Sequence, residues 1–225
     1  MKQTRYTLRA LARLLAYPGD QLRSELGLLV DAIDEEAALP AARRAELRAL
    51  AIGLQRLDPM EIESRYVETF DRGRATSLHL FEHVHGDSRD RGPAMIDLAQ
   101  TYEKAGLFLS PEELPDHLCV VLEFASTQPP QVAKSFLGEV AHILNAIFSA
   151  LLQRESPYAA VIAAVLEMAG EKPQAVPITQ DEPMDESWAE PQAFDGCSTR
   201  GQARPGEAQP IHIVRPSRSA ERAAA

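Results

Sequence analysis

Apolar residues recur every three or four positions along the first 170 residues, and this spacing constrains the fold more than any other feature of the sequence. Leu8, Leu11 and Leu15 give the first instance, and later segments repeat it. Residues spaced in this way lie on one face of an α-helix. The period-two alternation that is typical of strands does not compete with this pattern. The sequence therefore predicts an all-α protein, a single-domain helical bundle over residues 1–170.

Turn and capping residues divide the first half of this body into successive helices. Residues 17–19 (Tyr-Pro-Gly) end the first helix, and Asp20 is expected to cap the second. A third helix opens at Pro40, and Asp58-Pro59 is typical of an N-cap followed by proline at the first helical position. The pattern weakens between Gly73 and Gly86, where we expect a loop or a short irregular helix.

The second half contains further start and stop signals. Pro93 is expected to begin a helix that ends at Gly106. Residues 110–113 (Ser-Pro-Glu-Glu) match a capping box, and Asp116 is expected to cap the helix that follows it. One long helix is predicted after Pro129-Pro130 and continues to Leu151, and a last one runs from residue 157 to Gly170.

The composition changes at Glu171. Proline recurs, the helical spacing vanishes, and a cluster of acidic residues is followed by arginines. Such a segment cannot bury enough apolar surface to offset the entropy lost on ordering, so residues 171–225 are predicted to form a disordered tail. Trp188 lies in this tail. Three roles are open for it: it anchors a docking motif, it packs against the helical body, or it is solvated like the rest of the tail.

Charge and cysteine content exclude several classes of function. The formal net charge of −10 argues against nucleic acid as a partner, because phosphate binding needs clustered Lys and Arg. The 2 cysteines, Cys119 and Cys197, are far apart and support neither a disulfide scaffold nor a thiolate metal site. Arg9 and Arg13 interrupt the apolar N-terminal stretch, and a signal peptide would need an unbroken run. We expect a cytoplasmic protein that is not inserted into the membrane.

Histidines gather in the weakly periodic segment. His79 and His83 are four residues apart and His85 follows, which superficially offers metal ligands. The zinc-protease motif needs a glutamate directly after the first histidine, and Leu80 occupies that place. Hydrogen bonds that tie a loop to the helices explain these histidines better, and the sequence predicts no metal, cofactor or catalytic residue.

Asp116-His117 resembles a catalytic dyad only superficially. Adjacent residues on a helix point about 100° apart and rarely bond side chain to side chain. A nucleophile is also missing, because Ser110 is better explained as a cap and Cys119 lies among apolar neighbours. We expect His117 to satisfy a nearby backbone group or to contact a ligand.

A peptide-binding groove is the remaining hypothesis. Tyr66, Phe70, Leu78 and Phe81 can line an apolar groove for an amphipathic helix, although plain core packing competes strongly for Tyr66 and Phe70. Nearby carboxylates can receive arginines of the peptide unless the arginines that alternate with them satisfy them internally. These carboxylates are Asp71, Glu82, Asp87 and Asp90.

Three segments carry a resemblance to a known family. They are YVETFDRG (66–73), SLHLFEHVHGDSRDRG (77–92) and ELPDHLCVVLEF (113–124). Together they resemble the NarJ group of the TorD/DmsD redox-enzyme maturation proteins, the assembly chaperones of respiratory nitrate reductase. The third segment is similar to the signature of the wider family, and the first two are more specific to the NarJ group.

The resemblance implies a TorD-like helical bundle that binds the N-terminal leader of the nitrate reductase catalytic (alpha) subunit and promotes molybdenum cofactor insertion. The apo-enzyme and molybdenum cofactor delivery proteins are the implied partners. On this basis the expected peptide-binding residues are Tyr66, Phe70, Asp71, Leu78, Phe81, His83, Asp87, Asp116 and His117. Two alternatives stay open: a chaperone of another molybdoenzyme, such as an S- or N-oxide reductase, and a metalloprotein or hydrolase built on the histidine cluster.

Overall fold

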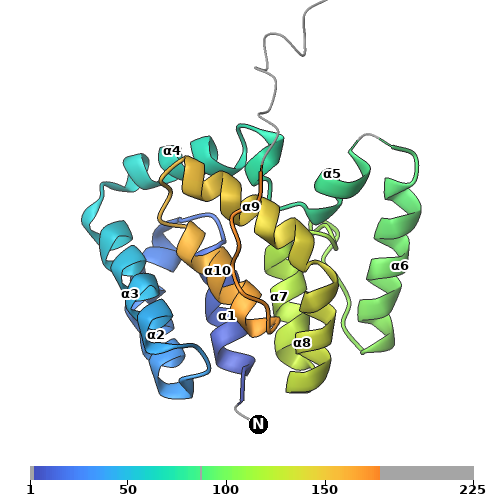
Figure 1. Ribbon diagram of the computed structural model, residues 1–225, viewed down its shortest axis with the longest axis horizontal. Helices are drawn as coiled ribbons and strands as arrows, with labels where there is room; N and C mark the ends of the chain where they lie inside the picture. Colours follow the sequence, from blue (N-terminus) through green and yellow to red (C-terminus); the bar gives the residue numbers. More distant parts are fainter. Residues whose placement is uncertain (1–2, 87, 178–225) are drawn as a thin grey trace, which may run out of the picture. The chain divides into compact units, whose positions relative to one another are not determined.

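Helices account for nearly all the regular structure in the described part of the chain, as its apolar spacing predicts (Figure 1). The computed structural model describes residues 3–86 and 88–177, all of which belong to one compact unit, residues 1–183. In these residues the elements are α1 (Arg5–Leu14), α2 (Asp20–Glu36), α3 (Ala41–Arg56), α4 (Pro59–Phe70), the short 3-10 helix η1 (Arg74–Thr76), α5 (Leu80–His85), α6 (Arg91–Lys104), α7 (Leu118–Thr127), α8 (Pro130–Glu139), α9 (Ala141–Gln153) and α10 (Ala159–Met168). The predicted all-α fold is confirmed.

Helix α10 forms the centre of this unit. Apart from Glu167 near its end, its residues are apolar, and the run from Val161 to Leu166 is completely buried. A helix without a polar face has to be enclosed by other elements. Accordingly α10 packs against α1, α3, α8 and α9, and in Figure 1 it runs between the α2–α3 pair and the α7–α8 pair.

Helix α1 lies between α2 and α7, with which it makes its most extensive contacts. The predicted leucine face, Leu8, Leu11 and the C-cap residue Leu15, is buried as the spacing predicts. The end of α2 stabilises the start of α1, because the Glu36 carboxylate accepts hydrogen bonds from the backbone amides of Tyr6 (3.1 Å) and Thr7 (2.7 Å). The first amides of a helix have no partner within it, so the carboxylate acts as an N-cap supplied by another helix.

Some predicted caps are confirmed and others are wrong. Asp58 caps α4 as expected, accepting from the Met60 amide at 2.9 Å, with Pro59 at the first helical position. Asp20 is already the first residue of α2 and makes no capping bond. Residues 110–113 form a turn rather than a helix start, although the Ser110 amide donates to Glu113 at 3.3 Å, as in a capping box. Pro115 follows two residues later, and because proline interrupts helical hydrogen bonding, this turn does not extend into a helix.

The single long helix predicted after Pro130 is in fact two helices. The chain leaves helical geometry at Val140 (φ −100°, ψ 7°), and α8 and α9 are inclined by 68°. This bend lets α8 pack on α7 while α9 packs on α10 and η1. A straight helix of this length would extend about 36 Å and could not pack on α7 and on the α10–η1 pair at the same time. Apolar spacing alone does not reveal such a break, because both halves keep the same period.

The weakly periodic segment contains two short helices, η1 and α5, in agreement with the expected irregular structure. Gly86 ends α5 with a positive φ of 51°, a conformation that favours glycine. Beyond it α6 begins at Arg91, two residues before the predicted start, and lies at the edge of the unit in Figure 1. Tyr102 is the one buried residue that the structure describes in α6.

The helical body ends at Met168, and Gly170 follows with a φ of 81°. Residues 171–177 follow without regular secondary structure and lie beside α9, where the Gln174 amide donates to Asn145 (2.9 Å) and the Val176 amide donates to Ser149 (2.8 Å). The rest of the predicted tail, including Trp188 and Cys197, lies outside the described residues.

In the described part of the chain no single helix has the length and apolar composition of a membrane span; the bent α8–α9 pair meets these criteria only when its two helices are counted together.

Candidate functional site

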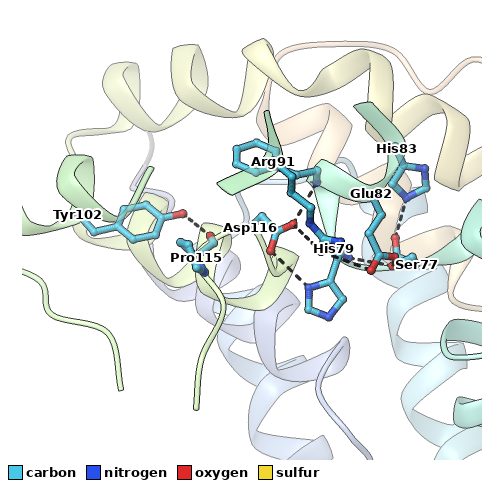
Figure 2. Close-up of polar contacts among 9 residues, drawn as sticks. Ser77, His79, Glu82, His83, Arg91, Tyr102, Pro115 and Asp116 are labelled. Carbon is cyan, nitrogen blue, oxygen red and sulfur yellow. Dashed lines mark hydrogen bonds and ion pairs between the residues drawn. The ribbon is translucent and has the colours of Figure 1, made fainter. Parts of the chain in front are cut away.

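Two of the sequence segments singled out above lie side by side. The Leu118 amide donates to the Leu78 carbonyl (2.9 Å), and the Leu80 amide donates to the Asp116 carbonyl (3.1 Å). These bonds form an isolated antiparallel bridge between His79 and His117. Consequently the start of α5 is joined to the start of α7, and the polar side chains of both segments meet there (Figure 2).

The carboxylate of Asp116 is the centre of this polar cluster. It is completely buried, and it accepts a hydrogen bond from the Phe81 amide at 3.1 Å. The His79 Nδ1 atom lies 3.4 Å from Oδ1, and the Arg91 guanidinium lies 3.8 Å from Oδ2. A buried carboxylate needs such partners, because desolvation of an unpaired charge costs several kcal/mol or more.

The cluster shifts the pKa values of Asp116 and His79. Burial raises the pKa of Asp116, but the hydrogen bonds from His79 and the Phe81 amide outweigh it, so the pKa is lowered overall. The hydrogen bond to Asp116 raises the pKa of His79, although desolvation opposes this. Each partner therefore favours the charged form of the other.

A second set of bonds fixes the turn between η1 and α5. The Ser77 hydroxyl donates to Glu82 at 2.6 Å, and the His83 Nε2 atom lies 2.9 Å from the Ser77 carbonyl, to which it donates. Arg91 contacts Glu82 at 3.4 Å as well as Asp116, so it links the two sets of bonds. Figure 2 shows these side chains converging from α5, α6 and the segment before α7.

Tyr102 attaches α6 to the same region. Its hydroxyl donates to the Pro115 carbonyl at 2.8 Å, and the residue is 1% exposed. His117 occupies the N-cap position of α7, and its ring packs edge-on against that of His79, with centroids 4.9 Å apart. Burial lowers the pKa of His117, and the neighbouring His79 lowers it further. The site therefore favours the neutral form of His117 and the charged form of His79.

Among the described residues, this arrangement shows no activated nucleophile. The Ser77 hydroxyl donates to the Glu82 carboxylate and not to a histidine ring, and burial raises the pKa of the Cys119 thiol to about 12, which disfavours its thiolate form. Within residues 3–86 and 88–177, no three His, Cys, Asp or Glu side chains are placed to hold a metal ion. The bonds instead position α5, α6 and the start of α7 relative to one another.

Comparison with known proteins agrees with this interpretation. The family model described as "Nitrate reductase delta subunit" matches residues 36–164. The chain is 40% identical over 188 residues to the "Nitrate reductase molybdenum cofactor assembly chaperone NarJ" of Escherichia coli (strain K12), covering 82% of this chain and 78% of that protein. The chain belongs to the nitrate reductase delta subunit family. The predicted resemblance to this group is confirmed.

Other members of the nitrate reductase delta subunit family and one solved structure extend the comparison. The chain is 30% identical over 164 residues to the "Probable nitrate reductase molybdenum cofactor assembly chaperone NarJ" of Bacillus subtilis (strain 168), covering 71% of this chain and 86% of that one. A putative redox enzyme maturation protein from Archaeoglobus fulgidus superposes with a TM-score of 0.53 at 20% identity, covering 76% of this chain and 96% of that one. At this identity the likeness shows the fold alone.

The structure does not bring the predicted groove residues of this family member to an open surface. Tyr66, Phe70 and Leu78 are 7%, 4% and 3% exposed, and the Tyr66 hydroxyl donates to the Leu15 carbonyl at 2.8 Å. Tyr66 and Phe70 pack against Tyr158 of the last helices, as core aromatic residues do. These three side chains therefore belong to the packed core of this structure and are not exposed, and their part in peptide binding stays a prediction.

The remaining predicted residues differ in exposure. Phe81 is partly exposed beside His85, with ring centroids 5.6 Å apart, and Asp71 is exposed at the end of α4. His83 and His117 are partly exposed, and Asp116 is buried in the cluster. Asp116 was expected to cap α7 and instead binds α5, because the chain before α7 turns toward α5. Asp87 lies outside the described residues.

Sequence reasoning missed an apolar cleft on another face. It encloses about 410 Å³ between α1, α7 and the segment that joins α6 to α7. Its lining residues are Arg9, Arg13, Tyr102, Leu107, Phe108, Leu109, Glu113, Val120, Glu123, Phe124 and Thr127. The signal for it was a run of three apolar residues, 107–109, between Gly106 and a polar turn, outside any helical period.

Proposed function

We propose that this protein is an assembly chaperone of a respiratory nitrate reductase, which binds the N-terminal leader of the catalytic (alpha) subunit and promotes molybdenum cofactor insertion before the enzyme attaches to the membrane. It acts on the apo-enzyme in the cytoplasm and leaves the mature complex. The cofactor is the client's in this proposal, and cofactor delivery proteins are further partners.

The observation that carries the proposal is the 40% identity to a protein named as the assembly chaperone of nitrate reductase, over most of both chains. The polar cluster around Asp116 supports it physically. Its bonds are used to hold helices together, as in a binding scaffold, and its side chains complete no reactive site. The formal net charge of −10 is consistent with a basic client segment.

Calorimetry with the leader peptide tests the binding step. The folded protein is titrated with a peptide of the alpha-subunit leader, and a saturable heat at one site per chain is expected. A peptide of the same composition in scrambled order is the control, because it keeps charge and hydrophobicity but loses the amphipathic face. No saturable heat with the folded chaperone would contradict the proposal.

Competition separates this function from a chaperone of another molybdoenzyme. The leader of an S- or N-oxide reductase is added to the preformed complex, and it should displace the nitrate reductase leader weakly. Preferential binding of the S- or N-oxide reductase leader would favour the alternative client. Elemental analysis of the purified protein addresses the metalloprotein alternative, which predicts a stoichiometric metal.

The assembly step needs a cellular experiment. The nitrate reductase operon is expressed with and without this chain, and the alpha subunit is purified from both. We expect the chain to co-purify with the alpha subunit and the molybdenum content of that subunit to fall when the chain is absent. Equal molybdenum content in both preparations would show that cofactor insertion does not depend on the chain.

A further inference from the structure

The chain changes direction where the last helix ends. The Gly170 amide donates to the Glu167 carbonyl at 3.0 Å, and the φ of Gly170 is 81°. The Glu171 amide donates to the Leu166 carbonyl at 2.9 Å. Two such bonds around a glycine form a Schellman motif, which ends a helix in a defined direction. Residues 171–177, the strap, therefore leave α10 along a fixed path and lie beside α9 (Figure 1).

Helix α9 carries a polar stripe on one face, at the positions His142, Asn145, Ser149 and Gln153. The Asn145 side-chain amide donates to the Ala141 carbonyl at 3.1 Å, and the Ser149 hydroxyl donates to the Asn145 carbonyl at 2.7 Å. The donors of both side chains are thus used within α9, and their oxygens are left to accept. These oxygens accept from the strap, from the Gln174 amide at 2.9 Å and from the Val176 amide at 2.8 Å.

The spacing of these two bonds fits an extended backbone. Four residues of a helix rise by about 6 Å, and two residues of an extended chain span about 6.7 Å. Alternate amides of an extended segment therefore reach acceptors four residues apart on a helix. Pro173 and Pro177 flank the two donors, and proline restricts the residue before it to extended conformations. The sequence of the strap thereby lowers the entropy that is lost when the strap binds.

The strap is held by its backbone and not by its side chains. Its residues are exposed apart from Pro173, which is half-buried, and Val176 is 36% exposed. Ser149, by contrast, is 3% exposed. A segment that contributes no buried apolar side chain can detach without exposing the core, and such segments open far more often than the whole fold.

We propose that Asn145 and Ser149 form a binding site for an extended peptide backbone on α9, and that residues 171–177 occupy it as a releasable strap, which opens while the helical body stays folded. The chain's own segment is the occupant, because the turn at Gly170 delivers it to α9 and its prolines favour the form that fits. While the strap is closed, the two acceptors are unavailable to any other extended segment. This inference does not depend on the proposed chaperone function.

Hydrogen exchange measured by NMR on the full chain tests the strap directly. The Gln174 and Val176 amides should exchange about tenfold or more slowly than the Ala175 amide, which makes no hydrogen bond to the residues that the structure describes. They should still exchange much faster than the amide of Val165 in the buried centre of α10. Equal rates at the three strap amides would contradict the alternating contact.

Substitutions on α9 test the binding site. Ser149→Ala removes the acceptor for Val176, and exchange at Val176 should become several-fold to about tenfold faster. Asn145→Ala should do the same at Gln174. Asn145→Asp is the matched control, because it loses the same donor to Ala141 but keeps an acceptor for the strap, so Gln174 should stay protected. Unchanged exchange at Gln174 and Val176 in both alanine variants would show that α9 does not hold the strap.

The amides of α10 decide whether the strap is releasable. Their exchange rates should be the same in the wild type and in both alanine variants, because the helical body does not open with the strap. If the α10 amides lose protection together with the strap, the strap is an integral part of the fold and the proposal is wrong. If protection of Gln174 and Val176 falls on dilution of the wild type, the strap binds a second copy of the chain, which also overturns it.

Discussion

The carboxylate of Asp116 accepts a hydrogen bond from the backbone amide of Phe81, 35 residues earlier in the chain, at 3.1 Å. Phe81 lies in the first turn of α5, where amides lack partners within the helix. A side chain in the segment before α7 thus acts as the cap of another helix. This relationship couples the placement of α5 to that of α7.

Substitution of Asp116 by asparagine should loosen this coupling. Asparagine keeps the size and one acceptor but loses the charge that His79 and Arg91 face, so we expect a loss of about 1–3 kcal/mol in the free energy of unfolding. Urea denaturation measures this loss, and faster hydrogen exchange of the Phe81 amide would localise it. Asp97→Asn, at an exposed position of α6, is the control. An unchanged exchange rate at Phe81 would contradict the capping role.

The His79–Asp116 pair should make stability depend on pH. The raised pKa of His79 means that its contribution is complete below its ordinary value of 6.5 and is lost as pH rises through the raised value. The lowered pKa of Asp116 means that its contribution is complete above 3.8 and is lost as pH falls through the lowered value. The pair therefore stabilises the fold most between about pH 4 and pH 6.5.

His79→Gln isolates this contribution. The difference in unfolding free energy between wild type and variant should be larger at about pH 5.5 than at about pH 8.5. His117 acts in the opposite direction, because its lowered pKa disfavours protonation in the folded state. The corresponding difference for His117→Gln should therefore shrink or reverse toward low pH. Parallel curves for the wild type and His79→Gln would show that the pair does not titrate with folding.

Local patterns predicted the helices well, because a helix is a local structure whose buried face repeats along the sequence. Leu22, Leu26 and Ile33 are buried as their spacing requires. The partner of Asp116 could not be predicted in this way. Capping rules concern the next few residues, and they pointed to α7, whereas the partner lies on α5.

The exposure of the predicted groove residues could not be predicted for a related reason. Burial of Tyr66 and Phe70 follows from their spacing, but whether another helix covers that face depends on the tertiary packing of Tyr158. Predicting the cleft at Phe108 also requires the tertiary packing to be known, since its walls come from α1 and α7. Sites that distant segments build together can be located only after the fold is known.

The bond from Tyr102 to the Pro115 carbonyl should hold α6 in place. Tyr102→Phe keeps the buried ring and leaves the carbonyl without this donor, so we expect a loss of about 1 kcal/mol in the free energy of unfolding. Limited proteolysis should then cut α6 faster than in the wild type. Tyr6→Phe, at a residue that is 54% exposed, is the matched control and should change neither quantity. Equal cleavage rates for the wild type and Tyr102→Phe would show that other contacts fix α6.

Glu36 should stabilise the fold through α1 rather than through its own helix. A negative charge at the end of α2 is unfavourable for α2, but the carboxylate accepts from the Tyr6 and Thr7 amides at the start of α1. Glu36→Gln weakens both bonds, and the expected loss is about 1 kcal/mol in the free energy of unfolding. Glu35→Gln, at the exposed neighbouring position, removes a charge from the same end of α2 and should be neutral or slightly stabilising. Urea denaturation of both variants decides the question, because equal effects would mean that only the charge at the end of α2 matters.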